Sequence, residues 1–226
     1  MVGSLYIVST PIGNLDDITK RAIDILRLVD VILCEDTRVT KKLLNHYKIE
    51  KKLFVYNDIN EHKKATGILD LLTSGTNVAL VSDAGTPCIS DPGYRLVNLS
   101  QKNDINVFSI PGPCSVISAL SISGLPTDNF FFQGFLPKKK GRHTKLGELS
   151  GLKCSVVLFE SPKRVIKTLN NIEKYFGDRY VAICRELTKI YEEVVLDKIS
   201  NILLNKENIK LKGEFIIIIA KDGYKN

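Results

Sequence analysis

Residues 83–93, DAGTPCISDPG, combine two aspartates with two glycines and two prolines directly after the apolar run 78–81. Glycine lets a ligand approach the backbone closely, and proline fixes the shape of a loop in advance. Backbone N–H and C=O groups held in this way could bind a purine edge and a ribose. The carboxylate of Asp83 could bind hydroxyl groups or lie near a cationic centre. We therefore interpret residues 82–89 as a ligand-binding turn.

A simpler interpretation stays open for part of this stretch, because Asp is also a common N-cap residue. Asp91 directly precedes Pro92, and proline suits the first position of a helix. We favour an N-cap for Asp91. For Asp83 capping is the alternative, with the glycines only turning the chain.

The first half of the chain alternates short apolar runs with amphipathic segments, which is typical of a mostly parallel sheet covered on both faces. Ligands of such sheets bind beyond the carboxyl ends of the strands. Four turns rich in Gly, Pro or charged residues fall at those ends: residues 10–14, 34–38, 82–91 and 111–115. We expect strands at residues 4–9, 31–34, 53–56, 77–81 and 106–110, with helices at 16–29, 37–47, 61–72 and 92–101.

The second half contains more strand pairs, and its helix alternation is weaker. We expect a helix up to residue 123, a helix at 163–176, a basic loop at 137–145, and strands at 129–133, 154–159, 180–184, 191–196 and 214–220. The sequence thus predicts an α/β protein of two α/β domains: residues 1–112 with a mostly parallel sheet, and residues 113–226 with a mixed sheet.

Composition narrows the classes of protein. The net charge of +7 favours a polyanionic partner without proving one. Five widely spaced cysteines predict free thiols and a cytoplasmic protein. The longest aliphatic run, residues 215–220, is too short to span a membrane, and the N-terminus lacks the basic start of a signal peptide. The GxGxxG, GxxxxGK[ST] and GxSxG motifs and any Cys/His metal cluster are absent from the sequence.

Eight segments occur in one order over almost the whole chain: LYIVSTPIGNLDDIT (5–19), CEDTR (34–38), VALVSDAGTPCISDPGYRLV (78–97), IPGPCSVISAL (110–120), FFFQGFLPKKKGR (130–142), LFESPKRV (158–165), CRELTKIYEE (184–193) and KGEFIIII (212–219). Together they closely resemble the ribosomal RNA small-subunit methyltransferase I family. That family belongs to the tetrapyrrole methylase superfamily, the class III S-adenosylmethionine-dependent methyltransferases.

The resemblance implies transfer of a methyl group from S-adenosylmethionine to the 2′-hydroxyl of a cytidine in the decoding region of 16S ribosomal RNA, leaving S-adenosylhomocysteine. It also implies two α/β domains with a cofactor cleft between them, a homodimer, no metal, and a substrate within the small ribosomal subunit. Family members often carry a further basic segment after the last strand, whereas this chain stops at Asn226.

The reaction that the resemblance implies sets three tasks for the residues, and an alternative stays open for two of them. The cofactor residues are Pro11, Asp83, Gly85, Thr86, Pro87, Ile89, Cys114, Ser115, Leu187, Gly213, Glu214 and Phe215. The candidate general bases are Glu35, Asp36 and Glu186, which could instead pair structurally with Arg38 or Arg185, leaving alignment alone to drive the reaction. The RNA contacts are Arg38, Lys138, Lys139, Lys140 and Arg142, unless the basic loop is only a solvated surface.

Two rival functions stay open. One is a methylase of tetrapyrroles or of another small molecule in the same superfamily, although the tetrapyrrole enzymes' GDP turn is absent here and the basic loop has no obvious use there. The other is a basic RNA-binding module without catalysis, which binding of S-adenosylmethionine would count against.

Overall fold

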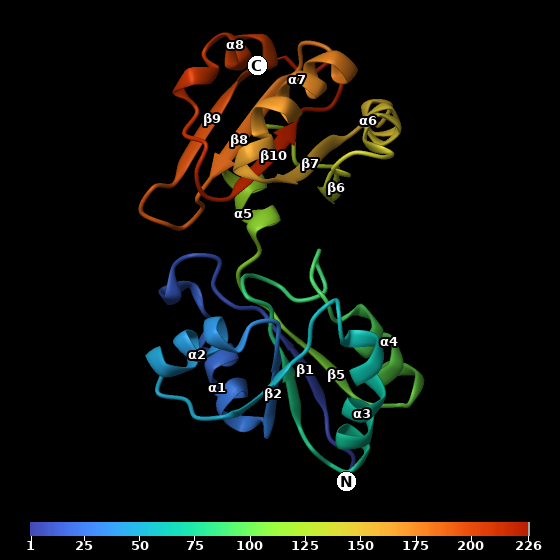
Figure 1. Ribbon diagram of the computed structural model, residues 1–226. Helices are drawn as coiled ribbons and strands as arrows, with labels where there is room; N and C mark the ends of the chain where they lie inside the picture. The colour runs from blue at the N-terminus through green and yellow to red at the C-terminus, as the bar shows by residue number, and fades with distance from the viewer. Residues whose placement is uncertain (226) are drawn as a thin grey trace. The chain divides into compact units, whose positions relative to one another are not determined.

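The computed structural model describes residues 1–225, and the chain divides into two compact units, Met1–Cys114 and Ser115–Asn226. Each unit has its own five-stranded sheet (Figure 1). The boundary expected from the sequence, after residue 112, lies two residues earlier. None of the helices in residues 1–225 is long and apolar enough to cross a membrane.

The first unit is a parallel sheet in the order β3-β2-β4-β1-β5. Helices α1 and α2 cover one face, and α3 and α4 cover the other (Figure 1), because each helix turns one apolar stripe to the sheet. The elements are β1 (Leu5–Val8), η1 (Leu15–Asp17), α1 (Lys20–Leu28), β2 (Val31–Cys34), α2 (Thr37–His46), β3 (Lys52–Val55), α3 (Glu61–Thr73), β4 (Val78–Leu80), α4 (Tyr94–Lys102) and β5 (Val107–Ile110).

The second unit has a mixed sheet in the order β6-β7-β10-β8-β9, in which only β6 and β7 are parallel neighbours. Its main core packs α6, α7 and α8 on one face, and α5 contacts β10. The elements are α5 (Ser115–Ile122), β6 (Phe130–Phe135), α6 (Arg142–Ser150), β7 (Ser155–Glu160), η2 (Pro162–Arg164), α7 (Val165–Phe176), β8 (Tyr180–Arg185), β9 (Glu193–Lys198), α8 (Ile199–Leu204), η3 (Lys206–Asn208) and β10 (Phe215–Ile219).

The structure differs from the sequence-based expectations in three helical regions. The helix expected over residues 16–29 is interrupted at Ile18 and Thr19, where the backbone is extended and the Thr19 hydroxyl caps α1 by accepting from Ala22 N. The basic loop is shorter than expected because α6 begins at Arg142. Helix α8 was missed, since six residues carry too little periodicity to show a helix.

The N-cap predicted at Asp91 is also wrong. Helix α4 begins at Tyr94 after Gly93, which has φ +134°. A Cβ at Gly93 would lie 2.6 Å from Cys88 Sγ and from Leu80 Cδ2, so the chain needs glycine there. Asp91 instead lies inside the turn that precedes the helix.

Candidate functional site

The turn after β4 is fastened to the turn after β1 by a two-way backbone bridge. Thr10 N donates to Gly85 O over 2.9 Å, and Gly85 N donates to Thr10 O over 3.0 Å. The buried Thr10 hydroxyl also donates to Ser82 O over 3.1 Å. These bonds hold the backbone of residues 82–85 in one shape before any ligand arrives, as a binding turn requires.

The turn after β5 joins the same cluster through Thr86. The Thr86 hydroxyl donates to Pro113 O over 3.1 Å and lies 3.0 Å from the Ser9 hydroxyl. Gly85 has φ +84°, and a Cβ there would lie 3.3 Å from Ile12 Cγ2. Glycine therefore allows the turns after β1, β4 and β5 to approach one another.

The turn after β2 completes the cluster through Asp83. The Asp83 carboxylate accepts from Asp36 N over 3.1 Å, and Asp83 N lies 3.4 Å from Glu35 Oε1. Asp83 is therefore not a helix cap; it ties two turns together and keeps an exposed side chain. All four turns singled out in the sequence thus meet at the carboxyl edge of the first sheet.

The carboxylates at this edge differ in their proton affinity. Burial, and next the nearby Asp91, raise the pKa of Glu35 to about 7. Burial also raises the pKa of Asp91 to about 6, and partial desolvation of the Asp83 carboxylate raises its pKa as well. Each of these carboxylates repels the charge of the others, so the edge favours a bound proton or a cation.

Asp36 has a structural role. Its carboxylate accepts from Arg38 N over 2.8 Å as the N-cap of α2, and it pairs with the Arg38 guanidinium over 2.6 Å. These bonds hold the pKa of Asp36 at about 2. Of the candidate bases, Asp36 is therefore one that pairs structurally with Arg38 instead of taking a proton. Arg38 itself keeps an 86% exposed side chain, which leaves it accessible to a phosphate.

A hollow of about 250 Å³ lies beside Ser82 and Asp83, entirely within the first unit. Pro11 lines it, as do several residues that the sequence analysis did not select: Thr10, Leu15, Val39, Thr40, Lys42 and Leu43. Val39 and Leu43 of α2 follow the apolar period of a core helix, so no sequence signal separated them from ordinary core positions.

The predicted residues of the second unit also come together. Glu186, at φ +53°, accepts from Lys189 Nζ over 2.8 Å and from Glu214 N over 3.0 Å. Gly213 has φ +87°, which favours glycine, and a Cβ there would also lie 2.3 Å from the Glu186 carboxyl carbon. The hydrogen bond from Lys189 is the main cause that lowers the pKa of Glu186, which makes it a weak base at neutral pH.

The remaining predicted cofactor residues vary in exposure. Leu187 and Phe215 are buried beside the Glu186 loop, and Pro87 is buried in the first unit. Ile89 is exposed, Cys114 ends the first unit, and Ser115 begins α5. Among residues 1–225, no three His, Cys, Asp or Glu side chains are grouped as metal ligands.

The prediction that Arg142 contacts RNA is wrong in this structure. Arg142 is 2% exposed, and its guanidinium donates to Thr168 Oγ1, Asn171 Oδ1 and Pro137 O. It also lies 3.8 Å from the buried Glu160 carboxylate. A run of basic residues does not show which side chain turns inward, so sequence alone does not separate Arg142 from its exposed neighbours.

Lys138, Lys139 and Lys140, in contrast, are all exposed. They occupy the short segment between β6 and α6, so their ammonium groups are accessible to a polyanion.

Comparison with known proteins agrees with this arrangement. The family model of tetrapyrrole (corrin/porphyrin) methylases matches residues 4–203. The ribosomal RNA small subunit methyltransferase I of Thermotoga maritima is 47% identical over 97% of this chain and 99% of its own length. The Vibrio cholerae protein of the same name is 46% identical over 98% of this chain and 78% of its own length. The chain belongs to the ribosomal RNA small subunit methyltransferase I family.

Membership in this family makes the chain a methyltransferase and implies S-adenosylmethionine as the methyl donor. Solved structures agree on the fold alone. Diphthine synthase aligns with TM-score 0.75 and 13% identity over 96% of this chain and 90% of its own. The cobalamin biosynthetic enzyme cobalt precorrin-4 methyltransferase aligns with TM-score 0.67 and 20% identity over 96% and 94%. The predicted α/β fold of the tetrapyrrole methylase type is therefore confirmed.

Proposed function

We propose that this methyltransferase modifies the 2′-hydroxyl of a cytidine in the decoding region of 16S ribosomal RNA, using S-adenosylmethionine. The observation that carries the proposal is the meeting of four loop segments at one acidic edge of the first sheet. Hydrogen bonds join these four segments. The chain that contains them is 46–47% identical to two proteins named ribosomal RNA small subunit methyltransferase I.

The residues at this edge fit the methyl donor. S-adenosylmethionine supplies an activated methyl group on a cationic sulfonium. The carboxylates of Glu35, Asp83 and Asp91 provide the negative potential that a cation needs. The fixed backbone of residues 82–86 offers N–H and C=O groups for the nucleoside part. Pro11, Gly85, Thr86, Pro87 and Ile89 are the cofactor residues that we assign in the first unit.

The second unit supplies the other proposed cofactor residues. Leu187, Gly213, Glu214 and Phe215 form one fixed loop pair, since Glu186 N donates to Glu214 O over 3.0 Å and the Glu186 carboxylate accepts from Glu214 N. Cys114 and Ser115 complete the set at the boundary of the units. Glu186 thus holds this loop pair in shape rather than taking a proton.

Among the three candidate bases, Glu35 fits proton abstraction best. A base works most efficiently when its pKa lies near the working pH, and the pKa of Glu35 is about 7. Asp36 is committed to capping α2 and to Arg38, and Glu186 to Lys189. We assign Glu35 the proton of the ribose hydroxyl, and we assign Arg38 and lysines 138–140 to RNA phosphates.

A tritium methyl-transfer assay tests the function. Small ribosomal subunits, free ribosomal RNA and a tetrapyrrole are offered separately, and we expect label in the RNA of the small subunit at a ribose 2′-oxygen. Label in the tetrapyrrole alone would replace the proposal with a small-molecule methylase. Cofactor binding without any transfer would reduce the chain to a binding module.

The first prediction is that Asp83→Ala weakens S-adenosylmethionine binding about 10- to 100-fold, the range for losing a hydrogen bond to a charged group. The reason is that the variant loses both the carboxylate and the tether to Asp36 N. Calorimetry measures the affinity, and circular dichroism checks the fold. Asp70→Ala, an exposed-helix control from α3, should bind normally. Unchanged affinity in the Asp83 variant would limit Asp83 to joining the two turns.

The second prediction concerns lysines 138–140. Changing all three to Gln should weaken RNA binding and flatten its salt dependence by about 0.7–0.9 per lost phosphate contact. Cofactor affinity should stay unchanged. Binding of 16S ribosomal RNA at several salt concentrations gives the slope, and an unaltered slope would make the lysines a solvated surface. Arg142 is not substituted, because replacing a buried arginine would destabilise the fold and could lower RNA binding indirectly.

We further propose that the substrate is recognised within the small ribosomal subunit, that the enzyme works in the cytoplasm and that it forms a homodimer. These proposals rest on the family resemblance, and the net charge of +7 supports an RNA partner. Light scattering of the purified chain at micromolar concentration reports the oligomeric state, and a monomer mass would remove the dimer.

A further inference from the structure

An exposed aromatic ring lies at the end of β6. Phe135 is 55% exposed and pairs in register with Phe159 of β7, whose ring centroid lies 5.6 Å away at an interplanar angle of 60°. A bulge between Phe132 and Gly134, with Gly134 at φ +69°, places both Phe132 and Phe135 against Phe159. Phe135 therefore contacts the ring of Phe159 and keeps more than half of its surface exposed to solvent.

Two arginines hold the backbone that follows Phe135. Arg164 Nη1 donates to Leu136 O over 3.2 Å, and Arg142 Nη1 donates to Pro137 O over 3.3 Å. Both guanidiniums face the buried Glu160, at 2.7 Å for Arg164 and 3.8 Å for Arg142. This arrangement fixes the segment between Phe135 and Lys138 on the frame of β7 and α7.

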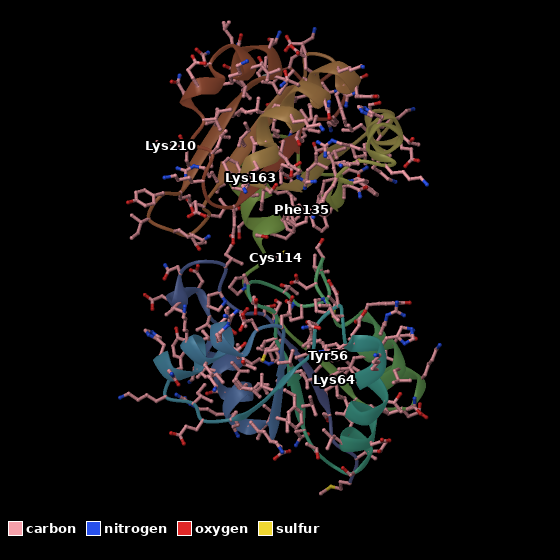
Figure 2. The ribbon with its side chains drawn as sticks, in the orientation of Figure 1. Tyr56, Lys64, Cys114, Phe135, Lys163 and Lys210 are labelled. Atoms are coloured by element: carbon pink, nitrogen blue, oxygen red, sulfur yellow. The ribbon has the colours of Figure 1, made fainter. Side chains whose placement is uncertain are left out.

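Free positive charge surrounds this segment. Lys138, Lys139, Lys140 and Lys163 are exposed, and Lys163 follows β7, the parallel neighbour of β6. Parallel strands end at the same edge, and Figure 2 shows Phe135 and Lys163 at that edge of the second unit. Residues 130–147 and 161–172 contain no Asp or Glu, so no carboxylate within these segments offsets the lysines.

We infer that Phe135 is a stacking platform for an unpaired RNA base and that Lys163 joins lysines 138–140 in holding the flanking phosphates. The inference rests on the proposed function, since it takes RNA as the substrate. Single-stranded nucleic acid is bound by this combination, in which rings stack on bases while cations follow the backbone. Charge complementarity selects RNA over an apolar protein partner, which would leave four ammonium groups without counter-charges.

Two fluorescent 12-nucleotide RNA probes test the platform, one with ordinary bases and one with abasic sugars throughout. Because both have the same phosphates, their difference isolates stacking. Phe135→Ala should weaken binding of the base-bearing probe about 5- to 150-fold, the range equivalent to one stacked base. It should change the affinity for the abasic probe less than twofold. Phe135→Trp should preserve binding, because indole also stacks.

Matched variants separate the two kinds of contact. Phe131 is 41% exposed but pairs with Val156, on the opposite face of β6 from Phe135, so Phe131→Ala should bind both probes normally. Lys163→Gln should weaken both probes alike and reduce the salt slope by about 0.7, the value for one single-strand phosphate.

Three results would overturn the platform. The wild-type chain could bind the two probes with equal affinity. Phe135→Ala could bind both probes as tightly as the wild type, or it could lose the same amount of affinity for both. A changed mass of Phe135→Ala in light scattering would also overturn it, in favour of an interface between copies. Methyl transfer by the wild type is measured separately. If the wild type transfers no methyl group but Phe135 still contributes to binding of the base-bearing probe, the proposed function is wrong and the stacking platform is retained.

Discussion

Glu35→Gln is expected to lower the rate of methyl transfer about 10²- to 10⁴-fold, the usual contribution of general base catalysis. Glutamine keeps the size of the side chain and an oxygen that can accept from Asp83 N, but it cannot take a proton. Cofactor affinity should fall less than the rate does, because Asp83 and Asp91 keep their share of the negative potential at this edge. Single-turnover transfer on small ribosomal subunits measures the rate, and calorimetry measures cofactor binding. Glu50→Gln, at an exposed position in the same unit, is the control.

The rate of methyl transfer should also rise with pH, because the general base must be ionised. Glu35 can accept a proton only when ionised, and its pKa is about 7. The wild-type rate should therefore be half-maximal near pH 7 and level off about one pH unit higher. Asp91→Asn removes a negative neighbour that raises the pKa of Glu35, so the rise should move to lower pH.

A Glu35→Gln variant that keeps its activity would assign this residue a different role. A Gln variant as fast as wild type, with the same pH profile, would show that alignment of the ribose hydroxyl suffices. Glu35 would then serve only to support the turn at Asp83.

Glu160→Ala should lower the free energy of unfolding of the second unit by about 3–5 kcal/mol, the range for breaking a buried ion pair from one side. Its carboxylate accepts from Ser161 N and Thr168 Oγ1 and pairs with Arg164, all within 2.7 Å. Without it, the buried Arg142 guanidinium loses its counter-charge. Urea unfolding followed by circular dichroism measures the loss, and hydrogen exchange of β7 and β10 amides assigns it to this unit.

Glu148→Ala is the matched control, because its side chain is 57% exposed and its carboxylate pairs with the partly exposed Lys145, three residues earlier on the same helix. We expect a change within about 0.5 kcal/mol there. Glu160→Gln should cost less than Glu160→Ala, since the amide oxygen retains part of the hydrogen bonding. Equal stability of the Ala variant and wild type would mean that solvent reaches Arg142.

The sequence was sufficient to predict the strands of the first sheet and to single out residues 82–89 as a candidate ligand-binding turn. Buried parallel strands appear as short apolar runs, and Gly and Pro restrict the backbone locally, so both signals are carried by neighbouring residues. The position of Asp91 was misjudged for a related reason. Asp-Pro matches a helix start, but the close approach of Cys88 and Leu80 to Gly93 moves that start to Tyr94.

The sequence by itself determined the class of fold, the family and the turns that could bind a ligand, because these depend on residue type and order. Only the tertiary structure decided what individual charges do. Asp36 and Glu186 are bound by partners, Glu35 is left with a pKa of about 7, and Arg142 turns inward to Glu160 while Lys138–Lys140 stay exposed. Burial and partners from distant segments set the energy of a charge, and neither can be read from its neighbours in the chain.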